Sequence, residues 1–213
     1  MKMKKLIELA NNIKDDELRK RVVEFLEDPK LTHKDFKKYP RMKIEEAGSV
    51  FTVSTPAGTA SVERDVLNHT IALVDMCMKT ADSLEKSYGL SVDRDDLIAA
   101  AILHDITKIF EWKKGESGLE HTGILLDHTM LGVAELYHRG FPENVIHIIA
   151  SHFGESGPTP PRNFEALILH HLDSMLSSTE FHLYGAKAQQ PMQLVVVDEE
   201  TIKKLGGEKA EKK

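Results

Sequence analysis

The sequence has few of the features that mark secreted, membrane-bound or nucleic-acid-binding proteins. Only one of its 213 residues, Cys77, is a cysteine, which excludes an internal disulfide framework and is typical of a reducing cytosol. It contains no run of about 18 apolar residues, the length that a membrane-spanning helix needs. The first residues, MKMKKLIELANN, are also too polar for a signal peptide. We therefore expect a cytoplasmic protein without a membrane segment.

Basic and aromatic residues are also scarce. The formal net charge is −6 and aromatic residues make up 6% of the chain. Binding of single-stranded nucleic acid usually requires a positively charged groove and aromatic side chains on which bases stack. We therefore expect a small-molecule partner rather than nucleic acid. The 41% of hydrophobic residues is enough for one buried core, and the length suits one substantial domain with small appendages.

Breaks in the helical pattern divide the chain into four parts. Residues 1–63 predict two short amphipathic helices, the second capped by Asp15, and then a β-hairpin or flap around residues 56–58. Residues 64–185 have a helical pattern throughout. Residues 186–205 predict a strand and a helix, and residues 206–213 a polar, flexible tail. The predicted fold class is all-α, a helical bundle with a small β-hairpin before it and a short strand near the C-terminus.

Histidine is unusually frequent, with eleven residues. Burial of an imidazole or a carboxylate without a partner is costly, so we looked for such groups on the apolar faces of predicted helices. The predicted helices cover residues 64–88, 94–110, a segment from about 127, residues 142–152 and a segment from about 163. Each carries at least one inward polar group. These groups are His69, His104, Asp105, His128, His152 and Asp173.

A single histidine on a buried face usually bonds to a backbone carbonyl. Six polar side chains in one bundle would all need partners at once, and shared metal ions provide them. Imidazole and carboxylate ligands without thiolate suit iron, manganese, zinc, nickel or cobalt, and six ligands are too many for a four-coordinate structural zinc. We therefore predict two divalent ions, about 3.5–4 Å apart, that share one carboxylate and hold a hydroxide for attack on a phosphoryl group.

These residues, in this order, resemble the HD-domain superfamily of metal-dependent phosphohydrolases over roughly residues 64–185. The segments that carry the resemblance are VLNHT, ILHDITK, LLDHTMLG, ASHFGE and LILHHLDSM. The resemblance implies an HD-domain helical bundle with iron or manganese favoured. One metal would be held by His69, His104, Asp105 and Asp173, and a second by Asp105, His128 and His152. Lys108 would contact the substrate phosphate. Thr107 stands where many relatives carry glycine, which affects the expected shape of the adjoining loop.

Two types within this superfamily are similar to the chain. The archaeal type opens 7,8-dihydroneopterin 2′,3′-cyclic phosphate in pterin biosynthesis, and it is similar in the short N-terminal helices, the KYP segment and the LHHLDSM ending. The bacterial 3′-to-5′ exoribonuclease type is similar in the SH-x-G and HHLD-like segments. It usually carries a nucleic-acid-binding barrel in front, for which residues 1–63 are too short and not basic enough.

We therefore expect metal-dependent hydrolysis of a small phosphate ester, with a cyclic phosphodiester favoured. The alternatives are a nucleotidase or an exoribonuclease of the same superfamily, or a non-catalytic metal-binding helical module. The sequence leaves a homo-oligomer open.

The remaining candidates have weaker support. His170 shares a helix face with Asp173 and is a candidate for orienting a ligand, and His121 is a candidate general acid in a predicted loop. Lys79 and Arg162 could contribute charge for a phosphate but are more often solvated. Residues 51–62 are predicted to form either a lid over the site or a hairpin against the bundle. We assign packing or surface roles to His33, His138, His147 and His171.

Overall fold

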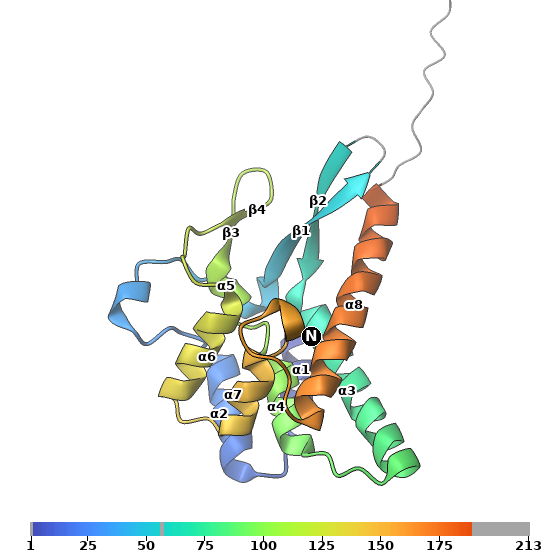
Figure 1. Ribbon diagram of the computed structural model, residues 1–213. Coiled ribbons are helices and arrows are strands. Elements are labelled where there is room, and N and C mark those ends of the chain that lie inside the picture. The colour runs from blue at the N-terminus through green and yellow to red at the C-terminus, as the bar shows by residue number, and fades with distance from the viewer. Residues whose placement is uncertain (1, 56–57, 189–213) are drawn as a thin grey trace, which may run out of the picture.

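The computed structural model describes residues 2–55 and 58–188. Its helices are arranged around α4 (Arg94–Leu103), a short apolar helix that is buried from Asp96 to Leu103 (Figure 1). A helix that is apolar on all sides requires neighbours on all sides. Five helices pack against it, namely α1 (Lys2–Ala10), α2 (Asp16–Glu27), α3 (Val66–Tyr88), α7 (Glu143–Ala150) and α8 (Phe164–Ala188). The predicted helical fold class is confirmed.

Aspartate side chains cap the starts of the helices that lead to the candidate site. The carboxylates of Asp65, Asp93 and Asp127 accept hydrogen bonds from first-turn amides of α3, α4 and α6 (His128–His138), respectively. Asp15 caps α2 in the same way, as predicted. Each such cap stabilises a helix start by about 1 kcal/mol. The caps therefore help to fix where the histidines of α3 and α6 lie.

A β-hairpin precedes α3, as predicted. Strand β1 (Gly48–Thr55) pairs antiparallel with β2 (Gly58–Asp65), and β2 continues directly into α3. Both strands pack against α8, and Figure 1 shows the hairpin standing beside the C-terminal half of that helix. In the described part of the chain this segment is thus a hairpin against the bundle.

A second hairpin lies where the sequence predicted only a loop. Strands β3 (Trp112–Lys114) and β4 (Leu119–His121) pair antiparallel, with Trp112 opposite His121. The two rings meet edge to face, with their centroids 5.7 Å apart. This cross-strand contact helps to hold the pairing together, but the strands are too short to give a clear alternating pattern.

Two predicted helices end earlier than expected. The helix predicted over residues 94–110 stops at Leu103, and the amides of residues 106 and 108–110 then bond to carbonyls three residues back, which turns the chain before the one-turn α5 (Lys108–Glu111). The helix predicted over residues 142–152 runs from Glu143 to Ala150, with Pro142 as its N-cap. His104, Asp105 and His152 therefore lie at helix ends and in turns.

The remaining described elements are three single-turn 3-10 helices, η1 (Lys34–Phe36), η2 (Ile44–Glu46) and η3 (Gly154–Ser156). The N-terminal helices share one apolar core with α3, α4, α7 and α8. Among the described helices, none combines the length and the apolar character needed to cross a bilayer. The strand and helix predicted within residues 186–205 fall, apart from the end of α8, outside the described residues, as does the tail at 206–213.

Candidate metal centre

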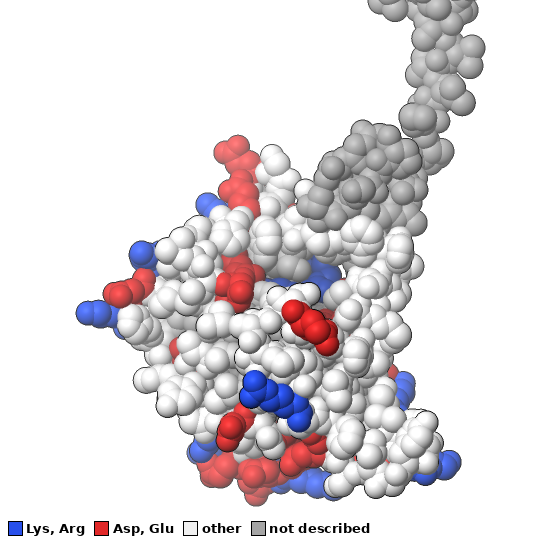
Figure 2. All heavy atoms as spheres, in the orientation of Figure 1, with Lys and Arg blue, Asp and Glu red and all other residues white. Residues whose placement is uncertain are grey.

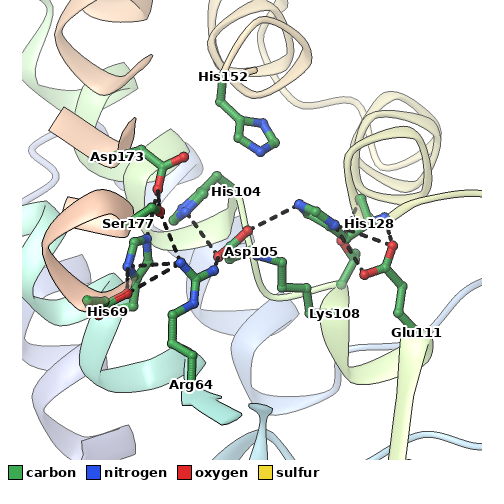
Figure 3. Close-up of polar contacts among 12 residues, drawn as sticks. Arg64, His69, His104, Asp105, Lys108, Glu111, His128, His152, Asp173 and Ser177 are labelled. Atoms are coloured by element: carbon green, nitrogen blue, oxygen red, sulfur yellow. Dashed lines mark hydrogen bonds and ion pairs between the residues drawn. The ribbon is translucent and has the colours of Figure 1, made fainter. Parts of the chain in front are cut away.

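Five segments that are far apart in the sequence bring the predicted ligands together (Figure 3). The ligands come from α3, the turn after α4, the start of α6, the turn after α7, and α8. All are buried except Asp173, which is half-buried. Possible ligand atoms lie within 4.8 Å of one another in two overlapping groups, one formed by His69, His104 and Asp105 and the other by Asp105, His128 and His152.

Asp105 lies between the two groups, and its two oxygens face different neighbours. Oδ2 lies 3.4 Å from Nε2 of His104, and Oδ1 lies 3.3 Å from Nε2 of His128. At the outer edge of the first group, Oδ1 of Asp173 lies 2.9 Å from Nε2 of His69. A carboxylate in the position of Asp105 can serve two ions at once, one through each oxygen.

Backbone carbonyls orient two of the histidines. Nδ1 of His104 lies 2.9 Å from the carbonyl oxygen of Ala101, and Nδ1 of His152 lies 2.8 Å from that of Ile149. A carbonyl only accepts, so Nδ1 must carry the proton in both rings. This leaves the lone pair on Nε2, the nitrogen that faces the centre.

Carboxylates orient the other two histidines. Nδ1 of His69 lies 3.0 Å from Oε2 of Glu180, and Nδ1 of His128 lies 3.2 Å from Oε2 of Glu111. Carboxylate–histidine pairs of this kind are common behind metal ligands, where they fix the ring and raise its basicity. All four imidazoles therefore present Nε2 to the same small volume.

Two of these inward nitrogens indicate what the site holds. Nε2 of His104 and of His128 are buried and have no hydrogen-bond partner among the described residues. Buried nitrogens without partners are rare in native proteins because each carries a desolvation cost. A cation between them and the Asp105 carboxylate would satisfy both lone pairs. The residues present thus fit divalent metal ions.

The charges in the site favour the protonation states in which carboxylates and imidazoles bind metal ions. Burial would raise the pKa of Asp105, but His104 and Lys108 hold it well below its usual range. Burial also opposes ionisation of Asp173, and the hydrogen bond to His69 keeps its pKa low. Burial, together with His104 and His128, lowers the pKa of His152 to about 4. At neutral pH the carboxylates are therefore ionised and His152 is neutral, which are the forms that bind metals.

The pKa values of His69 and His128 shift in the opposite direction from that of His152, because these two rings lie beside carboxylates. Burial lowers the pKa of His69, but its hydrogen bonds to Asp173 and Glu180 outweigh this and raise it. Burial and Lys108 likewise oppose protonation of His128, but the nearby carboxylates of Asp105 and Glu111 outweigh this and raise its pKa. In their protonated forms both rings would have to release a proton on binding a metal through Nε2, so metal affinity should increase with pH.

Arg64 is a major component of the site that the sequence analysis missed. Its side chain is only 8% exposed, and Nη2 donates to Oδ2 of Asp105 over 2.9 Å. Nη1 donates to Oγ of Ser177 over 3.1 Å and lies 3.4 Å from Oε2 of Glu180. Nothing in the local sequence sets Arg64 apart from a surface arginine, because its burial depends on how β2 meets α8.

A cavity of about 1030 Å³ opens onto the metal-ligand cluster. It is bordered by β1, α5, the segment after α7, and α8. Lys108, the predicted phosphate contact, lines it, with Nζ 2.7 Å from Oδ2 of Asp105. His121 also lines it from β4 and is exposed, and its Nδ1 accepts a hydrogen bond from the amide of Gly123.

His170 supports the segment that carries His152. Its Nδ1 lies 2.7 Å from the carbonyl oxygen of His152, so it bonds to the backbone of a predicted ligand. Gly154 has a φ of +57°, and a Cβ there would lie 2.3 Å from the His170 ring. The glycine is therefore needed both for the backbone conformation and for this close packing.

The residues to which the sequence analysis gave weaker or surface roles lie elsewhere. Lys79, Arg162 and His171 are exposed and do not line the described cavity. His33 and His138 are also exposed and line a separate pocket between η1 and α6. His147 accepts a hydrogen bond from the amide of Arg162 and is half-buried.

Comparison with known proteins identifies the family of the chain. Residues 66–184 match the HD domain family. The dihydroneopterin 2′,3′-cyclic phosphate phosphodiesterase of Methanocaldococcus jannaschii is 43% identical over 179 residues, which are 80% of this chain and 67% of that enzyme.

A second group of relatives is more distant. The 3′-5′ exoribonuclease YhaM of Bacillus subtilis is 33% identical over 120 residues, and that of a Geobacillus species is 32% identical over 133 residues. These matches cover 50% and 56% of this chain, but only 36% and 40% of the exoribonucleases. The chain thus spans less than half the length of these enzymes. No solved structure shows a significant match.

Proposed function

The chain belongs to the HD domain family, and from this we propose that it is a metal-dependent phosphohydrolase that opens a small cyclic phosphodiester. The observation that carries the proposal is the pair of overlapping ligand groups that meet at Asp105. The activity is that of the Methanocaldococcus relative, whose match extends over 80% of this chain. The favoured substrate is 7,8-dihydroneopterin 2′,3′-cyclic phosphate, which would place the enzyme in pterin biosynthesis.

The proposed ligand assignment follows the two groups and adds Asp173, which contacts His69. His69, His104, Asp105 and Asp173 would hold one ion, and Asp105, His128 and His152 the other. The imidazole nitrogens and carboxylate oxygens suit iron, manganese, zinc, nickel or cobalt, and among these we favour iron or manganese, as the family resemblance implies. A pair of divalent ions supplies a water of lowered pKa and charge stabilisation for a phosphoryl group.

The chain's own residues would position the substrate and handle its charge. Lys108 places a positive charge on the cavity wall beside Asp105, where a phosphate oxygen can accept from Nζ. We keep His121 as the candidate that protonates the leaving oxygen, because it is exposed and lines the same cavity. His170 would act only through the backbone of His152.

A small substrate suits the surface around the cavity better than a polynucleotide does. On the face shown in Figure 2, charged side chains of both signs are scattered among the described residues, without a basic stripe. A single-strand groove would need a continuous basic track. The exoribonuclease activity of the Bacillus relatives therefore ranks second. The single cysteine supports a cytoplasmic location.

We further propose that residues 64–185 form the catalytic core. Residues 1–63 would be packed on it through their helices and hairpin.

The test is metal reconstitution followed by a substrate series. Protein loaded anaerobically with Fe²⁺ or Mn²⁺ should hydrolyse bis-p-nitrophenyl phosphate and dihydroneopterin 2′,3′-cyclic phosphate. Asp105→Asn should lose both turnover and bound metal, whereas Asp75→Asn, at an exposed surface pair with Lys79, should lose neither. Turnover of monoesters alone would indicate a nucleotidase, and stepwise shortening of RNA an exoribonuclease. A fully metal-loaded but inactive protein would indicate a non-catalytic module.

A further inference from the structure

The cavity is far larger than a phosphate group requires, and its outer end differs in character from the end at the metal ligands. Near the ligands its wall is charged, with Arg64, Lys108 and Asp173. Farther out, β1 contributes Phe51 and α8 contributes Phe181. This outer end therefore has room for a part of the substrate other than its phosphate.

One face of α8 connects the two ends. Asp173, Ser177 and Phe181 are spaced four residues apart, so they lie along the same face. At 1.5 Å of rise per residue, Phe181 lies about 12 Å along the helix from Asp173. This separation suits a substrate in which a short carbon arm joins a phosphate to a ring.

The outer end has the chemistry of a ring-binding site. Phe51 and Phe181 are both half-buried, and their ring centroids lie 5.8 Å apart at an angle of 33°. The ring centroid of Phe51 also lies 6.2 Å from that of Tyr184, which is on the next turn of α8 after Phe181. Ser174 and Ser178 line the same wall, and both are exposed. Aromatic faces with polar groups beside them suit a flat heterocycle with hydrogen-bonding edges.

We propose that Phe51 and Phe181 bind the flat heteroaromatic ring of the substrate by stacking. They would thereby set the specificity for cyclic phosphates that carry such a heteroaromatic ring over those that do not. The two phenylalanines are specificity residues that do not touch the phosphate. This inference rests on the proposed function, because it assumes that the phosphate binds beside Lys108 and the metal ligands.

The experiment compares two probes that share a five-membered cyclic phosphate. One is 2′,3′-cyclic GMP, whose purine resembles a pterin in shape and in its hydrogen-bonding edge. The other is glycerol 1,2-cyclic phosphate, which has no heteroaromatic ring. Stacking on an aromatic side chain is worth about 5- to 150-fold in affinity. Phe181→Ala and Phe51→Ala should therefore raise KM for the purine probe at least about 5-fold. They should leave kcat/KM for the glycerol probe within about 2-fold, because the phosphate contacts are unchanged.

Two comparison variants separate recognition from folding. Phe181→Trp retains an aromatic face and should keep the preference for the purine probe. Phe164→Ala removes a phenylalanine side chain from the start of α8, where it is 49% exposed and outside the cavity. It should leave KM and kcat/KM unchanged for both probes.

Binding without turnover provides an independent measurement. Trp112, the only tryptophan in the chain, lines the same cavity. Neopterin, which carries the ring but no phosphate, should quench its fluorescence in metal-free protein, and Phe181→Ala should weaken this binding at least about 5-fold.

The outcomes distinguish the two proposals. If the wild type hydrolyses neither probe nor dihydroneopterin 2′,3′-cyclic phosphate, the proposed function fails. If it hydrolyses the probes but Phe181→Ala affects them equally, or neopterin binds both proteins alike, only the ring-binding proposal is wrong.

Discussion

The guanidinium of Arg64 and the carboxylate of Asp105 form an ion pair in the protein interior, with 2.9 Å between Nη2 and Oδ2 and side-chain exposures of 8% and 2%. Arg64 also contacts Glu180, so one cation compensates two buried acids. In metal-free protein, Arg64→Ala would remove this positive charge from both buried carboxylates and leave Lys108 beside Asp105 and His69 beside Glu180. We expect the free energy of unfolding to fall by about 3–5 kcal/mol, measured by urea denaturation in the presence of EDTA.

Two comparisons test whether this loss comes from buried charge. Saturation with Mn²⁺ should reduce the penalty of Arg64→Ala, because the metal supplies positive charge to Asp105. Arg94 pairs with Asp82 and Glu85 at the surface, so Arg94→Ala should cost no more than about 1 kcal/mol. Equal losses in the two variants would contradict the interpretation.

The sequence was sufficient to predict the metal-ligand candidates because each one interrupts an apolar run. His104 and Asp105 directly follow the buried run of α4, and His152 closes the apolar stripe of α7. A polar residue in such a position must find a partner in the core, so its placement can be inferred without coordinates. The structure brings these residues together, while their role as ligands remains a proposal.

The supporting residues could not be predicted in the same way. Arg64 and Glu180 lie in polar segments, where charged side chains are normally solvated, and they become buried only because β2 and α8 pack around His69. Glu111 lies at the end of a one-turn helix whose existence depends on the turn after α4. The helix ends at Leu103 and Ala150 were missed for a related reason, since hydrogen bonds in the following turns override the apolar periodicity.

The two carboxylates behind the histidines should each control one metal position. Glu180 supports His69, and Glu111 supports His128, to which it also bonds through the backbone amide. Replacing an acid of this kind usually lowers metal affinity by about 10- to 100-fold. We expect Glu180→Gln and Glu111→Gln each to retain one tightly bound ion and to weaken the other, measured by metal titration with elemental analysis. The double variant should weaken both.

The positions of these two carboxylates also determine which results would contradict this prediction. Because the histidines that they support, His69 and His128, lie on opposite sides of Asp105 (Figure 3), loss of one carboxylate should not remove the ion on the other side. If either single variant lost both ions together, the two positions would not be separately supported. Unchanged affinity in both variants would show that the carboxylates do not orient metal ligands.

Lys108 should affect catalysis without affecting metal content. Its Nζ lies 2.7 Å from Asp105 and faces the cavity, but an ammonium group cannot coordinate a cation. Lys108→Met retains the apolar stem and removes the charge. We expect kcat/KM for the cyclic phosphate to fall by about 10²- to 10³-fold, with bound metal unchanged. Lys113→Met, on the neighbouring β3 at an exposed pair with Glu120, should be close to wild type. Parallel loss of metal in Lys108→Met would assign Lys108 a structural role.

Cys77 should report directly on opening of the core. Burial raises the pKa of its thiol to about 12, and the side chain is fully buried in α3. Only the thiolate reacts with disulfide reagents, so at pH 8 the folded protein should react at least about 100-fold more slowly than the unfolded protein. Because reaction requires opening, Arg64→Ala should accelerate it under metal-free conditions. As a control, Tyr137→Cys in a Cys77→Ala background places a thiol at a site that is 77% exposed in the wild type, and it should react at once. Rapid reaction of Cys77 in the folded wild type would show that α3 is accessible at this position.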